Sequence, residues 1–148
     1  MNHRELLPIP HIETATDPVH SAADLRQRWR ALMGPLGFGE RLLRFAFMGP
    51  DRCLIKMLGD VEIGPAPKRP VIENLMSALR ELLCDMESNS TVAPLLTRPG
   101  PGGISNLDRQ WSTMLTDVAA EFGVPIEPVF RANDESLVQV EPQFERAR

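Results

Sequence analysis

Residues 95–108 read Leu95-Leu96-Thr97-Arg98-Pro99-Gly100-Pro101-Gly102-Gly103-Ile104-Ser105-Asn106-Leu107-Asp108, and the prediction of the fold begins with them. An apolar run from Val92 to Leu96 stops at Pro99, and a glycine-rich bend follows from Gly100 to Gly103. The segment after Ser105 has the apolar spacing of a helix. The stretch therefore predicts a strand, a bend and a helix start, an arrangement at which active sites are often built.

The composition is that of one ordinary globular domain. A chain of 148 residues is long enough to bury a sizeable core. Its 43% hydrophobic and 24% charged residues are close to globular averages, so extensive disorder is not expected. The net charge of -4 makes direct nucleic-acid binding an unfavourable interpretation, because proteins that bind the phosphate backbone usually carry a basic face.

Cysteine usage and hydropathy predict a cytoplasmic protein. Cys53 and Cys84 lack the spacing of a metal site or a disulfide framework, so we expect reduced thiols. Cys84 is expected on the apolar side of a helix as an inert core thiol. Met1–Pro10 has no apolar signal core, and no apolar run approaches the roughly 20 residues that a membrane span needs.

Periodicity and turn residues predict three helices and five strands. The helices begin near Ser21, Pro70 and Ser105, and Gly123 ends the third. The strands are expected at residues 42–48, 53–58, 91–96, 126–131 and 136–140, with a loop over 59–70. This order predicts an α/β fold, on the border with α+β, with a single mixed sheet and about three flanking helices.

The chain is expected to form one domain over residues 21–140. Residues 1–20 contain three prolines and show little periodicity, which predicts a flexible N-terminal arm, and residues 141–148 are expected to form a frayed tail. The arm carries all three histidines, His3, His11 and His20, at a spacing that fits no metal-ligand pattern. Whether the arm docks onto the bend and supplies ligands stays open.

Two interpretations of Ser105 and Asp108 are possible. Ser-x-x-Asp before an apolar helical run is typical of a helix cap, and we prefer capping over ligation of a metal. Asp108 with Glu40 from across the fold would make a poor zinc site, because no histidine joins them, whereas two carboxylates would suit a weakly bound magnesium ion. Ser105 also lacks a neighbouring histidine that would activate it as a nucleophile.

The glycine-rich bend offers an anion-binding interpretation. Residues 100–103 could cradle a phosphate at the start of the helix, with Arg98 as the cation. The bend lacks the Lys-Ser/Thr ending of a P-loop and the spacing of a dinucleotide fingerprint. A bound anion is therefore kept as the minority interpretation.

With these residues in place, the chain resembles the RadC branch of the JAB/MPN (JAMM) metalloprotease-like superfamily. The hallmark of that family is His-x-His-Pro-Ser-Gly, a short loop, and Pro-Ser-x-x-Asp at the start of a helix. Here Leu96–Pro101 stands at the first motif and Ile104–Asp108 at the second. Glu40, just before a predicted strand, stands where the family has the glutamate that completes its zinc site. The resemblance covers residues 21–140.

Both zinc-ligand histidines of the family are absent. Leu96 and Arg98 replace them, and Leu96 has no lone pair, while Arg98 would place a permanent positive charge beside a metal dication. We expect Arg98 to form an ion pair with Asp108 or Glu40 at that position. Zinc and other cofactors are therefore not expected.

The resemblance, with its ligands lost, implies a non-catalytic binding or scaffold module. Such a module would act by contact with a protein partner or by forming a homodimer. The alternative is a small-ligand or anion binder, or an atypical hydrolase, that uses the glycine-rich bend. In either case the candidate site comprises Glu40, Arg98, Ser105 and Asp108. A role in DNA repair is suggested only by the historical name of the family.

Overall fold

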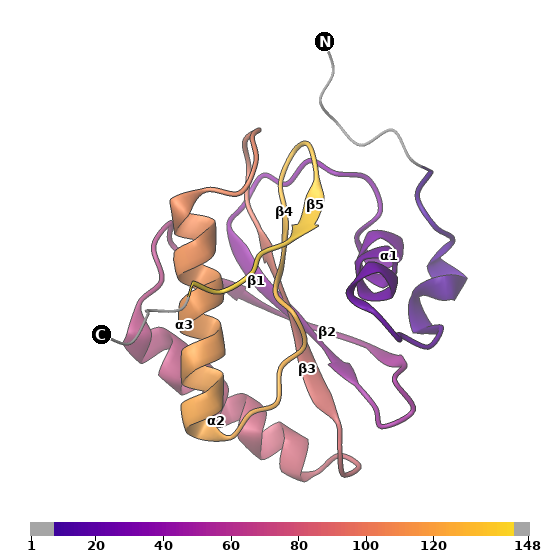
Figure 1. The fold of residues 1–148 in the computed structure, drawn as a ribbon, viewed down its shortest axis with the longest axis vertical. Helices are drawn as coiled ribbons and strands as arrows, with labels where there is room; N and C mark the ends of the chain where they lie inside the picture. The colour runs from indigo at the N-terminus through magenta and orange to yellow at the C-terminus, as the bar shows by residue number, and fades with distance from the viewer. Residues whose placement is uncertain (1–7, 144–148) are drawn as a thin grey trace.

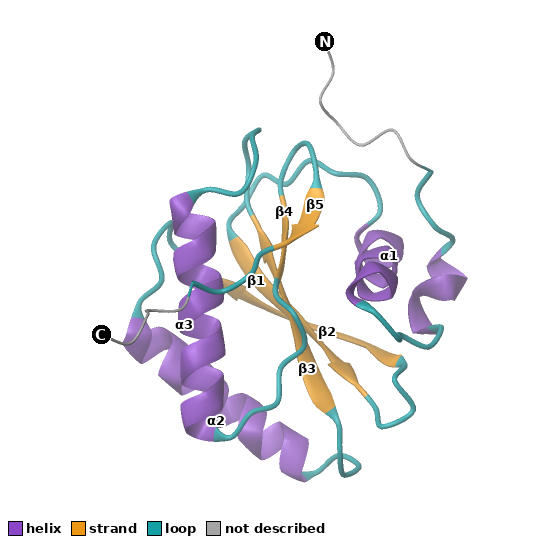
Figure 2. Ribbon diagram, in the orientation of Figure 1, coloured by secondary structure: helices purple, strands orange, loops and turns teal. Residues whose placement is uncertain are grey.

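The computed structural model describes residues 8–143, apart from the side chains of residues 56–58, and shows one mixed sheet between helices (Figures 1 and 2). The predicted α/β class with a single mixed sheet is confirmed. The elements are, in chain order, η1 (Ile12–Thr16), α1 (Ala22–Met33), β1 (Leu42–Met48), β2 (Leu54–Glu62), α2 (Arg69–Cys84), β3 (Thr91–Thr97), α3 (Asn106–Phe122), β4 (Phe130–Ala132) and β5 (Leu137–Gln139).

The sheet has the strand order β2-β1-β3-β4-β5, so β3 is the central strand, as predicted. β1 is antiparallel to both β2 and β3, and β4 is antiparallel to β5. β3 and β4 are parallel, and α3 is the crossover that parallel neighbours require. The bend from β3 into α3 therefore lies at the carboxyl end of the central strand.

Each face of the sheet packs against its own helices. Leu43 and Phe47 of β1 lie in one cluster with α2 and α3, whereas Ala46 and Met48 lie in another with α1. This division follows from the alternation of side chains along a strand. β3 is buried on both faces, which explains why its sequence is continuously apolar.

Pro94 lies inside the central strand, a position that proline usually avoids because it cannot donate a ladder hydrogen bond. It is buried and pairs with Phe45 of β1. On the other side of β3, pairing is interrupted between the Val92–Ile126 bridge and the Leu95–Phe130 pair. The missing N–H of Pro94 therefore falls within a gap in the β3–β4 ladder.

Helix α3 begins and ends as the sequence predicts. Ser105 is the N-cap and forms a capping box with Asp108. Gly123 ends the helix in the left-handed conformation, with φ of 69°, which glycine adopts without steric cost. The cap fixes Asp108 in the first turn of α3, directly beside the end of β3.

Three strands differ clearly in extent from the prediction. β2 continues to Glu62, so the predicted loop is wrong over residues 59–62. Gly59 ends a strand pattern in the sequence, but here it lies opposite the ring of Phe45, where no Cβ would fit. β4 and β5 are shorter than predicted, and Ile126 makes only an isolated bridge.

The prediction that Cys84 is a core thiol is wrong, because Cys84 is exposed. It is the last residue of α2, and Leu82, two residues before it, is also exposed. The apolar stripe of α2 is buried only through Ile72, Met76 and Leu79. The end of the helix still packs against the core cluster through the partly buried Leu83 and, just after the helix, Met86, so Leu82 and Cys84 lie on its outer side.

Residues 8–20 do not form a loose arm. They contain η1, and Ala15 and Val19 are buried with the α1 core and the β2 end of the sheet. Val19 also donates a backbone hydrogen bond to Arg52 O at 2.8 Å. The predicted boundary at residue 20 is therefore corrected for this segment, while His3 and most of the predicted tail lie outside the described residues.

No helix in residues 8–143 has the length and apolar character that crossing a membrane requires.

Candidate functional site

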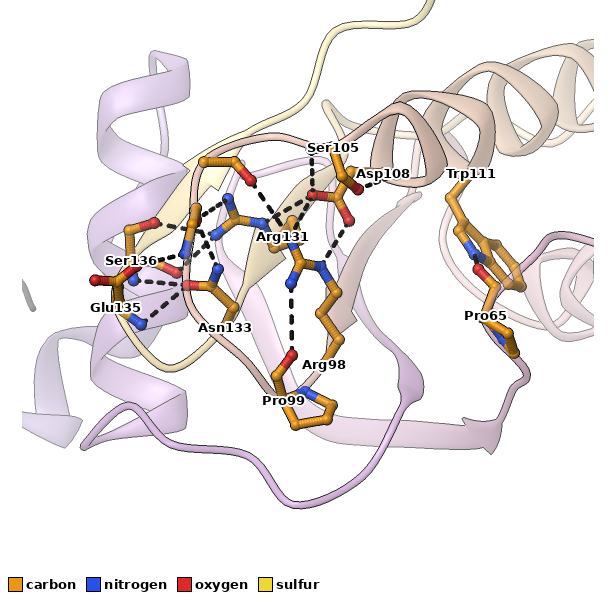
Figure 3. A network of polar contacts seen from close by, with 12 residues as sticks. Pro65, Arg98, Pro99, Ser105, Asp108, Trp111, Arg131, Asn133, Glu135 and Ser136 are labelled. Carbon is orange, nitrogen blue, oxygen red and sulfur yellow. Dashed lines mark hydrogen bonds and ion pairs between the residues drawn. The ribbon is translucent and has the colours of Figure 1, made fainter. Parts of the chain in front are cut away.

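The bend after β3 holds an ion pair between two of the predicted site residues (Figure 3). Arg98 Nε donates to Asp108 Oδ1 at 2.9 Å, and Arg98 Nη2 donates to Asp108 Oδ2 at 3.0 Å. The two side chains are 15% and 3% exposed. The predicted pairing of Arg98 with Asp108 is present, in the two-point geometry that a guanidinium makes with a carboxylate.

A second arginine, which the sequence analysis did not identify, reaches the same carboxylate. Arg131 Nε donates to Asp108 Oδ2 at 3.2 Å, and the Arg131 side chain is 0% exposed. Its Nη1 donates to Ser136 O at 3.1 Å and to Ser136 Oγ at 3.0 Å. Arg98, Asp108 and Arg131, hereafter the arginine–aspartate triad, join β3, α3 and β4.

The helix cap completes the environment of Asp108. The Ser105 N–H donates to Asp108 Oδ2 at 3.0 Å, and the Asp108 N–H donates to Ser105 Oγ at 3.0 Å. Burial raises the pKa of the Asp108 carboxyl, but the hydrogen bonds from Arg98 and Ser105 outweigh burial, so the pKa lies below its usual value. Asp108 is therefore a carboxylate whose oxygens accept four hydrogen bonds, and the capping interpretation of Ser105 is confirmed.

The glycine-rich bend is tied to the turn between β4 and β5. The Gly100 N–H donates to Asp134 Oδ2 at 2.9 Å, and the Gly102 N–H donates to Glu135 Oε1. Asn133 Nδ2 donates to Gly102 O at 2.8 Å. The amides of Gly100 and Gly102 already donate to protein carboxylates, so they are not available as donors to a phosphate. This argues against the interpretation of the bend as a phosphate-binding loop.

Glu40 is not brought into this network. It lies in the bend before β1, is exposed, and makes no ion pair with Arg98 within the described part of the chain. His11 and His20 are exposed beside η1 and α1. The structure therefore brings Arg98, Ser105 and Asp108 together and leaves Glu40 and these histidines apart from them.

The residues present do not fit the zinc ion that the resemblance would imply. Asp108 is the one carboxylate at the centre of the triad, and two guanidinium groups lie against it. Across residues 8–143, no group of three or more His, Cys, Asp or Glu side chains is placed to hold a metal ion. A dication at Asp108 would need to displace Arg98, and Leu96 would offer it no ligand.

A cavity of about 430 Å³ adjoins the triad. Arg98, Ser105 and Asp108 form part of its wall, together with Arg41, Leu107 and Trp111. The indole of Trp111 is held in place, because its Nε1 donates to Pro65 O at 2.9 Å (Figure 3). Arg41 was missed by the sequence analysis, although its position next to Glu40 at the start of a predicted strand was the available signal.

Comparison of the chain with protein-family models, curated proteins and solved structures finds no match.

Proposed function

We propose that the chain is a non-catalytic JAB/MPN-like module of the RadC type that acts by binding a protein partner or a second copy of itself. The arginine–aspartate triad carries the proposal. In the family that the chain resembles, the position of the triad holds a metal ion. Here two arginines, Arg98 and Arg131, neutralise Asp108, the aspartate that would be a metal ligand. The order of strands and helices around a capped helix start supports the same assignment.

The state of Asp108 argues for a structural role. A carboxylate that ligates a metal or acts as a general base needs an open lone pair toward the reacting group. The oxygens of Asp108 already accept bonds from Arg98, Arg131 and Ser105, and its pKa lies below its usual value. Asp108 therefore holds the bend, the helix and β4 together.

An atypical hydrolase built on Ser105 is less well supported. Ser105 Oγ accepts a hydrogen bond from the Asp108 N–H as the helix cap. The described histidines, His11 and His20, lie beside η1 and α1 and so are not placed to activate the hydroxyl. Ser105 is therefore assigned to the cap.

The sheet offers a surface for the proposed contact. β2 lies at one edge of the sheet, so one side of its backbone has no neighbouring strand. Such an edge can add a strand from another chain. Ile55, in the same strand, is among the exposed large hydrophobic residues. This edge is the surface that the proposal favours for a partner or a second copy.

Metal content tests the proposal. Purified untagged protein would be analysed for zinc, and its thermal unfolding would be measured with added zinc and with a chelator. We expect no stoichiometric metal and the same melting temperature in each condition, because binding to the folded state alone would raise it. Stoichiometric zinc that stabilises the fold would contradict a non-catalytic module and restore hydrolysis as the leading function.

A further inference from the structure

Two arginines and an isoleucine lie side by side where β1 begins and where β2 and β3 end. Leu43 of β1 pairs with Leu96 of β3 and with Val61 of β2. Leu43 and Leu96 lie in the core cluster with α2 and α3, and Val61 is on the same face of the sheet because it is the direct partner of Leu43. Side chains alternate along a strand, so the residues two positions further on return to the same face. These are Arg41, Arg98 and Ile63, and all three line the cavity. Ile63 N donates to Arg41 O at 3.1 Å, so the pairing reaches this row.

The two arginines differ in how their charges are balanced. Arg98 is paired with Asp108 through two hydrogen bonds. Arg41 is half-buried, and its side chain makes no ion pair or hydrogen bond with another residue in the described part of the chain. A half-buried cation without a protein partner favours an anionic group beside it. Arg41 is therefore the cation in this cavity that is available to a ligand.

The rest of the wall is mainly apolar. Ile63, Pro65, Pro101, Leu107 and Trp111 line it. Leu107 is 36% exposed although it belongs to the first turn of α3, and the Trp111 ring is fixed by its bond to Pro65. A preformed apolar cavity with few polar groups is typical of a small-molecule site, and about 430 Å³ lies in the usual size range.

We propose that this cavity binds a small monocarboxylate with a flat or branched apolar body. Its carboxylate pairs with Arg41 beside the outer edge of Arg98, and its apolar body lies against Trp111 and Leu107. Inorganic phosphate is a poor ligand, because the amides of Gly100 and Gly102 are already bonded to Asp134 and Glu135. This inference goes beyond the contact function and does not depend on it.

Phenylacetate is a suitable probe, with phenylacetamide as its uncharged counterpart and inorganic phosphate as an anion without an apolar body. Binding would be followed by titration calorimetry and by tryptophan fluorescence. The chain has two tryptophans, and Trp29 is buried in the α1 cluster, so a change on binding reports Trp111. We expect saturable binding of phenylacetate in the millimolar range and none of the other two compounds.

Two variants and a control locate the site. Arg41→Gln should weaken phenylacetate binding about tenfold, because it removes one charge-assisted hydrogen-bonding group. Arg80→Gln, at an exposed position on α2, should bind as the unmodified protein does. Leu107→Glu should abolish binding by repelling the carboxylate, and an acidic residue in the first turn of α3 should not destabilise the helix.

Three results would overturn the proposal. They are the absence of saturable phenylacetate binding, equal affinity for phenylacetamide, and equal affinity of folded Arg41→Gln and the unmodified protein. Circular dichroism would establish that each variant is folded.

Discussion

Arg98 and Asp108 lie ten residues apart, at the end of β3 and in the first turn of α3, and are joined by two hydrogen bonds of 2.9 and 3.0 Å. Arg131 of β4 adds a third at 3.2 Å. Burying charges is costly unless each one is paired and hydrogen-bonded. The triad meets this condition through Ser136 on one side and the capped helix on the other. It therefore fixes the bend that carries the cavity.

Removing the shared carboxylate should be strongly destabilising. Asp108→Ala leaves Arg98 partly buried and Arg131 fully buried without their ion-pair partner, and it removes half of the capping box. We expect a loss of about 3–5 kcal/mol in the free energy of unfolding. Urea denaturation would measure it. Asp117→Ala, at an exposed position on the same helix, should change stability by less than about 0.5 kcal/mol. Equal small effects of the two substitutions would contradict the role of the triad.

The triad should also make stability depend on acid pH. The pKa of Asp108 is lower in the folded than in the unfolded chain, so the unfolded chain takes up the proton first as pH falls. The stabilisation is complete above the ordinary aspartate pKa of about 3.9 and is lost as pH falls through the lowered folded value. The difference in unfolding free energy between the unmodified protein and Asp108→Asn should be constant above about pH 5 and shrink below about pH 4. A difference that does not change with pH would contradict this assignment.

The sequence predicts the helix α3 and its cap because both depend on local chemistry. Ser105 and Asp108 are three residues apart, and Gly123 follows the last apolar position of the helix. The ion pair of Arg98 with Asp108 was also predictable, since the bend brings the two residues together within a short segment. These features need no knowledge of distant parts of the chain.

Contacts between distant segments could not be predicted in the same way. Arg131 is one charge within an apolar segment, and its partner on α3 is set by the parallel pairing of β3 and β4. Arg41 lies beside Arg98 only because β1 and β3 are in register. The packing of residues 8–20 likewise depends on the turn at Arg52. Tertiary placement decides each of these, and local periodicity carries no signal for it.

We expect Gly59 to be required for stability, because this residue of β2 lies opposite Phe45 of β1 and against its ring. A Cβ at this position would overlap two carbon atoms of the Phe45 ring, so Gly59→Ala must displace the ring. We expect a loss of about 1–3 kcal/mol in the free energy of unfolding, as for other overpacked sites. Gly64→Ala is the matched control, because nothing lies within 4 Å of a Cβ there, and it should be nearly neutral. Chemical denaturation of both variants would check this, and equal stabilities would show that Phe45 moves aside without cost.

The capping role of Ser105 makes a separate prediction. Ser105→Ala removes the hydroxyl that accepts from the Asp108 N–H and should cost about 1 kcal/mol of stability. Ser77→Ala, at an exposed position within α2, should be neutral or slightly stabilising, because alanine favours the helix interior. Thermal unfolding of the two variants would separate the cap from a general effect of serine replacement. An unchanged melting temperature for Ser105→Ala would exclude the cap as a source of stability.

A double-mutant cycle between Arg98 and Asp108 tests most directly the claim that an ion pair holds this position. The unfolding free energies of Arg98→Met, Asp108→Asn and the double variant would be measured, with the exposed pair Arg69–Glu73 on α2 as a control cycle. We predict a favourable coupling of about 2 kcal/mol for Arg98 and Asp108, and about 0.5 kcal/mol or less for the exposed pair. Additive effects at Arg98 and Asp108, within about 0.5 kcal/mol, would contradict the account.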